Sequence, residues 1–214
     1  ELYSNYKIPF WMNTRAETIN EYRAAGLEEM NMLRMNIGIE HGNYDYRRKY
    51  LKRNVKDEVQ IRAFEIAAEH NYASCANSII GMPDETRELI FDTINFVRKL
   101  PDTIDATGAF IFAPYHGTPL RTLAIEKGYI KEDEICSLSN TSASMLNMPT
   151  ISKEEISGLA KVFSLYIKFP KERWPEIKIA EKNDDEGNKM MTKLGEEFDK
   201  TYRQFSATAL DLHD

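Results

Sequence analysis

The chain has 214 residues, of which 42% are hydrophobic and 29% charged, and its formal net charge is -6. This composition is typical of a soluble globular protein, and the acidic balance argues against a general nucleic-acid-binding surface. No apolar run approaches the roughly 20 residues that a membrane-spanning helix needs, and no signal peptide opens the chain, so we expect a cytoplasmic protein. Cys75 and Cys136 are too few for a disulfide framework or a closed metal site. We expect both cysteines, and also Trp11 and Trp174, to serve in packing.

The first predicted strand covers residues 6–13, which are rich in aromatic and apolar side chains. Thr14 is a candidate N-cap for a helix over residues 16–25, and Gly26 is a candidate helix end. Arg15 then follows the carboxyl end of this strand, together with Thr14.

A second apolar strand is predicted over residues 34–39, and it ends at Glu40 and His41. A long polar connection with several basic residues comes next. A helix over residues 56–70 follows, because apolar side chains recur there at helical spacing.

Residues 74–80 form a short apolar run that is typical of a buried strand. Gly81 lets the chain turn there without a Cβ clash, and Pro83 prevents simple continuation of the strand. A helix over residues 85–100 is expected next, with Asp84 or Thr86 as its cap.

A fourth strand is predicted over residues 105–113, followed by a glycine and proline turn and a helix over residues 120–127. Strands that alternate with helices indicate a parallel sheet, because parallel neighbours need a crossover connection. Ligands of such sheets bind at the carboxyl ends of the strands, which is where the polar clusters of this chain fall.

The pattern changes after residue 130. A polar loop is predicted over residues 137–150, a capped helix over residues 152–169 and a last helix over residues 190–205. We therefore divide the chain into an α/β region, residues 1–135, and a helical C-terminal extension, residues 136–214.

Five short motifs of the α/β region, in this order and spacing, resemble the later part of a radical S-adenosylmethionine (radical SAM) enzyme core. The branch it resembles often carries an upstream cobalamin-binding domain. The motifs are Asn13-Thr14-Arg15, Ile37-Gly38-Ile39-Glu40-His41-Gly42, residues 55–66 after Lys52-Arg53-Asn54, Ile79-Ile80-Gly81-Met82-Pro83-Asp84-Glu85-Thr86, and Pro114-Tyr115-His116-Gly117-Thr118-Pro119-Leu120.

The resemblance implies a partial (β/α) barrel, here with about four parallel strands followed by helices. In this family three cysteines of a Cys-x-x-x-Cys-x-x-Cys loop hold a 4Fe-4S cluster, which cleaves S-adenosylmethionine to a 5′-deoxyadenosyl radical. The sequence contains no such cysteine triplet. We therefore expect a fragment that is inactive alone and binds no cofactor alone. Its missing partner would be the N-terminal half of the barrel, and cobalamin could enter through an upstream domain.

The resemblance also assigns candidate cofactor-binding residues, each with a simpler alternative. Glu40 matches the acid that accepts hydrogen bonds from the ribose or amino group, and a helix-cap or salt-bridge acid is the simpler alternative. Arg53 matches a base for the cofactor carboxylate, but it could belong to a solvated basic run. The remaining candidates are Arg15 at the barrel mouth and Ile80, Gly81 and Tyr115 around the adenine, where turn formation and core packing are the alternatives. No catalytic residue and no metal ligand is assigned.

The expected parent protein is an enzyme of the Fe-S oxidoreductase or methyltransferase type, acting on a small-molecule or other substrate. Two other classes stay open: a non-catalytic α/β binding or scaffold module, and an ordinary (β/α) hydrolase or lyase that uses Glu40 and a histidine. Parallel strands cut from a barrel leave an open sheet edge, so a homo-oligomer is also expected.

Overall fold

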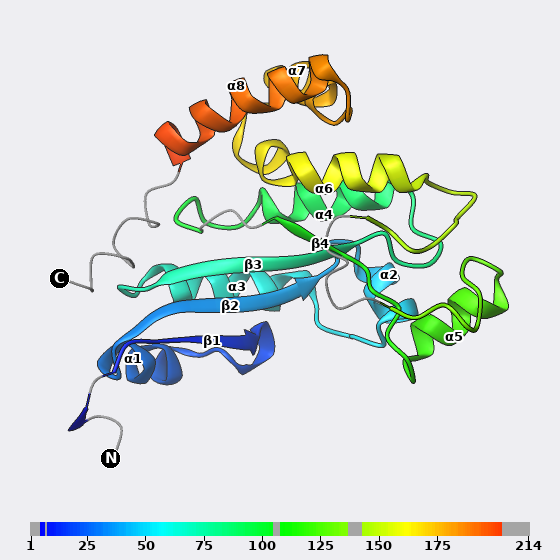
Figure 1. Ribbon diagram of the computed structural model, residues 1–214. Helices are drawn as coiled ribbons and strands as arrows, with labels where there is room; N and C mark the ends of the chain where they lie inside the picture. The colour runs from blue at the N-terminus through cyan, green and yellow to red at the C-terminus, as the bar shows by residue number, and fades with distance from the viewer. Residues whose placement is uncertain (1–4, 7, 105–107, 137–142, 203–214) are drawn as a thin grey trace.

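The computed structural model describes residues 5–6, 8–104, 108–136 and 143–202. Its centre is a four-stranded parallel sheet in the order β1-β2-β3-β4 (Figure 1). The strands are Phe10–Arg15, Met32–Glu40, Ala73–Ile80 and Ala109–Ile111. The predicted α/β fold, a partial barrel of four parallel strands followed by helices, is confirmed.

Helices connect the strands and cover one face of the sheet, as right-handed crossovers between parallel strands require. Helix α1 contacts β2, helices α3 and α4 contact β3, and helix α6 contacts β4. These helices are Glu21–Glu29, Asp57–Ala68, Arg87–Val97 and Lys153–Lys168. Thr86 caps α4 and Ser152 caps α6, as the sequence predicts, because each side chain accepts a hydrogen bond from a backbone N–H of the first turn.

The two faces of the sheet have different surroundings. Met35, Ile37 and Ile39 of β2 are fully buried on the helix-covered face. Side chains alternate along a strand, so the residues between them point to the opposite face, which we call the open face. On β1 the open face carries Trp11, which is 60% exposed rather than in the core as expected, and the Arg34 guanidinium lies over its ring at 5.3 Å.

The segment after β1 corrects the predicted helix start. Thr14 lies within β1 and its hydroxyl contacts the Thr18 hydroxyl at 2.7 Å, so it caps no helix. A short 3-10 turn, η2 (Ala16–Thr18), comes first, and Asn20 caps α1. Gly26 lies inside α1 and does not end it. The strand extends to Arg15 because pairing with β2 continues as far as Gly38.

Two short helices were not predicted. Helix α2 (Tyr44–Tyr50) occupies the polar connection, and its Arg47 is fully buried because the guanidinium bonds to the carbonyl of Val55 and the carboxylate of Asp57. Helix α7 (Trp174–Ala180) follows the 3-10 turn η3 (Lys171–Arg173). Both helices depend on partners distant in sequence, so local patterns do not reveal them.

The remaining helices lie after β4. They are α5 (Pro119–Glu126) and α8 (Asp185–Tyr202), and Figure 1 shows α7 and α8 on the side of α6 that faces away from the sheet. Ion pairs join Arg87 of α4 to Glu155 of α6 and to Glu181 at the end of α7. One hydrophobic core includes residues from Ala16 to Leu194. Parts of the predicted fourth strand (105–107), loop (137–142) and last helix (203–205) lie outside the described residues.

No helix within the described parts of the chain is long and apolar enough to cross a membrane.

Candidate cofactor-binding site at the strand ends

The β2 end holds Glu40 in an unusual backbone conformation. Its φ is +65°, in the left-handed region that non-glycine residues seldom adopt. The Glu40 carboxylate lies back over Gly38, where a β-carbon would occupy its place. Such strain in an ordered strand end is typical of a position held for function.

Arg53 is the main partner of Glu40. Its guanidinium is 6% exposed and donates to Glu40 at 3.2 Å and to Glu17 at 3.3 Å. Arg15 lies at the rim, 3.7 Å from Glu17, with its side chain 67% exposed. Arg53 therefore orients Glu40, whereas Arg15 is the cation that a ligand can reach; a direct contact of Arg53 with a cofactor stays a prediction.

Burial raises the pKa of the Glu40 carboxyl above its usual range, and the positive charges of Arg53 and Arg15 act against this rise. A partly desolvated carboxylate forms stronger hydrogen bonds with a ligand than one in bulk water does. Glu40 is therefore prepared to accept hydrogen bonds from a hydroxyl or ammonium group.

The β3 end places Ile80 and Gly81 differently from each other. The Ile80 side chain is fully buried in the core, and its carbonyl accepts a hydrogen bond from the N–H of Phe112. Gly81 has a φ of +78°, and a β-carbon there would lie 3.0 Å from Ile156 of α6. The turn thus needs glycine for both its conformation and its space. Any contribution of Ile80 to a ligand site would come from its backbone.

The β4 end contributes Tyr115 and His116, which lie in the turn before α5. Tyr115 is 50% exposed and its carbonyl accepts a hydrogen bond from the Thr118 hydroxyl. His116 is exposed as well. Glu40, Gly81 and Tyr115 thus follow the carboxyl ends of three neighbouring strands, on the shared edge where the sequence places them.

A pocket of about 240 Å³ opens beside Glu40 on the open face. Asn13 and Asn36 lie side by side on its floor, where the Asn36 amide donates to the Asn13 side-chain oxygen at 3.0 Å. The complete lining is Asn13, Thr14, Asn36, Gly38, Glu40, Asn77, Ile79 and Phe110. The pocket thus combines neutral amides with one carboxylate.

Comparison of the sequence with known protein families identifies the family of the segment that contains this site. The sequence profile described as Radical SAM superfamily matches residues 2–97. This segment belongs to the radical SAM superfamily. The match ends at the last residue of α4, so the radical SAM segment contains Arg15, Glu40, Arg53 and Gly81.

Two relatives extend the comparison. A protein of Pyrococcus horikoshii, named an uncharacterized methyltransferase, is 31% identical over 118 residues, or 55% of this chain and 25% of that protein. The radical S-adenosylmethionine methyltransferase TsrM from Kitasatospora setae, solved with cobalamin and a 4Fe-4S cluster, has the same fold with a TM-score of 0.53 and 13% identity. That match covers 89% of this chain and 46% of TsrM. The chain thus spans less than half the length of either relative.

The radical SAM segment contains a single cysteine, Cys75. Cys75 is buried within β3, and Cys136 lies beyond α5. The described residues contain no group of three or more His, Cys, Asp or Glu side chains arranged to hold a metal ion. The cysteine pattern of a 4Fe-4S site is also absent from the printed sequence.

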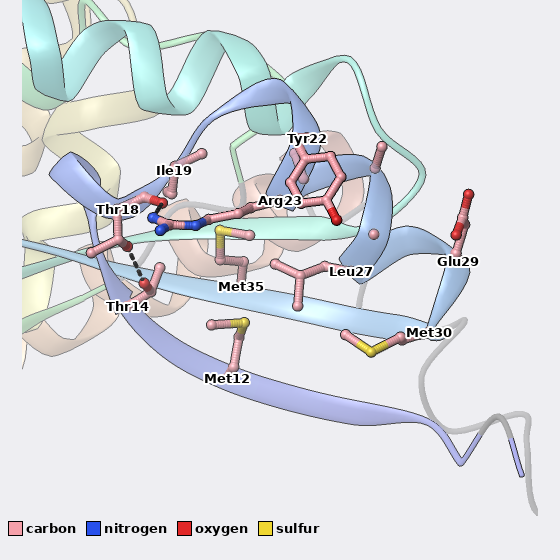
Figure 2. Close-up of a pocket in the computed structure, with 13 residues that line it drawn as sticks. Met12, Thr14, Thr18, Ile19, Tyr22, Arg23, Leu27, Glu29, Met30 and Met35 are labelled. Atoms are coloured by element: carbon pink, nitrogen blue, oxygen red, sulfur yellow. Dashed lines mark hydrogen bonds between the residues drawn. The ribbon is translucent and has the colours of Figure 1, made fainter. Parts of the chain in front are cut away.

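A larger hollow of about 910 Å³ lies away from these strand ends, between α1 and the edge strand β1 (Figure 2). The side chains of Met12, Leu27, Met30 and Met35 point into it, and Thr14 and Thr18 close one end. Its lining is mostly apolar, and its polar groups at the closed end bond to one another: the Thr14 and Thr18 hydroxyls meet, and the Arg23 guanidinium donates to the Thr18 carbonyl. Its size alone therefore does not make it the site of chemistry. It marks the uncovered flank of the sheet.

Three features of the site are missing from the sequence-based assignment. Glu85 is fully buried under the Gly81 turn, and Glu17 is the second partner of Arg53. Asp84 has a φ of +63°, and Tyr50, Tyr129 and Lys127 all bind its carboxylate. An acidic residue after a Gly-x-Pro turn was the available signal for Glu85, but acids are common in the first turn of a helix without any further role.

Proposed function

We propose that this chain forms the carboxyl half of the S-adenosylmethionine-binding barrel of a radical SAM enzyme. The observation that carries the proposal is Glu40, a partly desolvated carboxylate that Arg53 orients beside a pocket at the strand ends of the radical SAM segment. In a cofactor complex Glu40 would accept hydrogen bonds from the ribose hydroxyl or amino group. Arg15 would pair with the cofactor carboxylate, because it is the accessible cation at this rim.

The adenine would lie across the ends of β3 and β4. Gly81 lets a ligand approach the backbone closely, and Tyr115 offers an exposed ring for contact with a base. When bound to an iron-sulfur cluster, S-adenosylmethionine supplies a 5′-deoxyadenosyl radical for chemistry on a substrate. The residues of this chain bind and orient the cofactor, and they do not make the radical.

The cluster would come from a further segment that carries the cysteine triplet. The uncovered flank of the sheet, formed by the edge strand β1 and the apolar hollow beside α1, is where a preceding strand and helix would pack. We propose that this segment is the N-terminal half of the same barrel.

The reaction type that we propose is methyl transfer. It rests on the name of the Pyrococcus horikoshii relative, an uncharacterized methyltransferase, and on the fold shared with TsrM. Cobalamin would be a second cofactor only if a further domain supplies its site.

The direct test is binding of S-adenosylmethionine to the protein joined to a cluster-bearing N-terminal half, with iron and sulfide content measured after reconstitution. We expect Glu40→Ala to weaken binding about tenfold, as loss of a charged hydrogen-bond partner predicts. Glu126→Ala is the matched control, because Glu126 is an exposed acid on α5. An unchanged dissociation constant for Glu40→Ala, or a complex that binds neither iron nor S-adenosylmethionine, would contradict the proposal.

A further inference from the structure

His41 and Glu85 form a buried pair that joins the ends of β2 and β3. Both side chains are fully buried, and His41 Nε2 lies 3.1 Å from Glu85 Oε1. Within the described residues, His41 is the one basic side chain within 4 Å of the Glu85 carboxylate. The contact is oblique, since neither atom has the geometry of a straight hydrogen bond.

The two ring nitrogens of His41 contact different groups: Nδ1 faces Asn43 and Nε2 faces Glu85. The N–H of Asn43 donates to Nδ1 at 3.0 Å, so Nδ1 keeps its lone pair and the ring proton lies on Nε2, toward Glu85. The ring stacks on Tyr46 at 4.2 Å, and the Tyr46 hydroxyl donates to the carbonyl of Pro83 at 2.7 Å. His41 is thus held from both strand ends.

Glu85 fixes the turn after β3 from below. Its Oε2 accepts hydrogen bonds from the backbone N–H groups of Gly81 at 2.5 Å and Met82 at 3.0 Å. His41 directly follows Glu40, whose backbone has a positive φ. One pair of side chains therefore connects the strained backbone of Glu40 to the turn at Gly81.

A buried polar pair with an oblique contact is a poor source of stability, because desolvation costs more than such a contact returns. The His41–Glu85 pair instead holds the ends of β2 and β3 in a fixed relation. We infer that His41 and Glu85 are positioning residues that set the distance between Glu40 and the Gly81 turn and so preorganise the cofactor site. This inference rests on the proposed function for its purpose, but the connection between the two turns can be measured without cofactor.

Two substitutions separate the tasks of the two ring nitrogens. His41→Asn can keep an acceptor for the Asn43 N–H but cannot reach Glu85. His41→Gln can place an amide N–H near Glu85 but loses the acceptor at Nδ1. Asparagine removes more volume from this buried position than glutamine does, so exchange in each variant is compared with its loss of thermal stability.

The first measurement is amide hydrogen exchange at Gly81 and Met82 in this chain, together with thermal unfolding. We expect exchange at both amides to speed up about tenfold in His41→Asn and to return to within about threefold of wild type in His41→Gln. A merely structural role predicts that exchange at Gly81 and Met82 speeds up in each variant only as far as its loss of thermal stability requires. That result, or unchanged exchange in His41→Asn, would overturn the inference.

The second measurement is the dissociation constant for S-adenosylmethionine in the protein joined to its cluster-bearing half. We expect His41→Asn to weaken binding about tenfold and His41→Gln to restore most of it. If the wild-type complex binds and His41→Asn binds equally well, the positioning role is wrong. If the wild-type complex does not bind, the proposed function fails, and the exchange rates alone decide whether the pair connects the two turns.

Discussion

Gly38 leaves the space on the open face that the Glu40 carboxylate occupies, two residues further along β2. A side chain at position 38 would push this carboxylate away from the sheet and from Arg53. The absence of a side chain at one position thus sets the solvation and charge environment of another. Because the environment of the Glu40 carboxylate shifts its pKa, its ionisation can be measured as a change of folding stability with pH.

We expect Glu40→Gln to change how stability depends on pH. Burial raises the pKa of Glu40, against the fields of Arg53 and Arg15, so the folded protein holds this proton more tightly than the unfolded chain does. The stability that Glu40 contributes is then fully present below the unfolded pKa of about 4.3 and lost as pH rises through the folded pKa. Urea unfolding from about pH 4 to 7 should show Glu40→Gln gaining stability relative to wild type as pH rises.

Glu126→Gln, at an exposed acid of α5, is the control variant measured over the same pH range. Gly38→Ala should act in the same direction as Glu40→Gln, since it moves the carboxylate toward water. A stability difference for Glu40→Gln that shrinks as pH rises would contradict the placement of this carboxylate.

Substitution of Gly42 by alanine should lower the free energy of unfolding, because Gly42 packs tightly against α4. A β-carbon at position 42 would lie 2.6 Å from the carbonyl oxygen of Asp92, which belongs to the backbone of α4 and cannot rotate away. The Gly42 N–H also donates to the Thr93 hydroxyl at 2.9 Å, so the turn after β2 packs directly on α4. We expect Gly42→Ala to lower the free energy of unfolding by about 2–3 kcal/mol, as overpacking of a tight contact does.

Gly26→Ala is the matched control for Gly42→Ala. Nothing lies within 4 Å of a β-carbon at position 26, and the residue is inside α1. Alanine should therefore stabilise the chain by about 0.5–1 kcal/mol. Equal effects of the two substitutions in denaturant unfolding would show that the contact with α4 is absent.

Asp84 allows backbone strain to be separated from hydrogen bonding. Partial burial acts to raise the pKa of Asp84, but hydrogen bonds from Lys127, Tyr129 and Tyr50 outweigh it and hold the pKa below its usual range. Asp84→Ala and Asp84→Gly both remove these bonds, and only glycine also relieves the positive φ of +63°. We expect Asp84→Gly to be more stable than Asp84→Ala by about 0.5–1 kcal/mol in thermal unfolding. Equal stabilities would mean that this turn carries no strain.

The uncovered flank of the sheet predicts self-association of the isolated chain. Edge strands with exposed apolar side chains pair with other chains, and Trp11 of β1 is 60% exposed. Sedimentation velocity at increasing concentration should show dimers or larger species, and Trp11→Lys should reduce them. Tyr22→Lys tests the α1 side of the same flank, because Tyr22 is 87% exposed at the hollow. A monomer at all concentrations would contradict the prediction.

Local patterns located the parts of the fold whose stabilising contacts are near in sequence. The apolar runs of β2 and β3 and the caps Thr86 and Ser152 were all recognisable, because strand burial and helix capping act over a few residues. Helix α2 was not recognisable, since its buried Arg47 depends on Val55 and Asp57. Trp11 was expected in the core or in packing, whereas it lies 60% exposed on the open face.

The amino-acid sequence alone determined the alternation of the four strands with connecting helices, the parallel sheet and the edge at which Glu40, Gly81 and Tyr115 lie. These follow from side-chain periodicity and from the rule that parallel strands need crossovers. Only the tertiary structure decided that Arg53 is buried between Glu17 and Glu40, that Gly38 makes room for a carboxylate, and that His41 meets Glu85. Burial and charge pairing depend on distances between residues far apart in the chain. The spacing of residues within a short segment does not predict these distances.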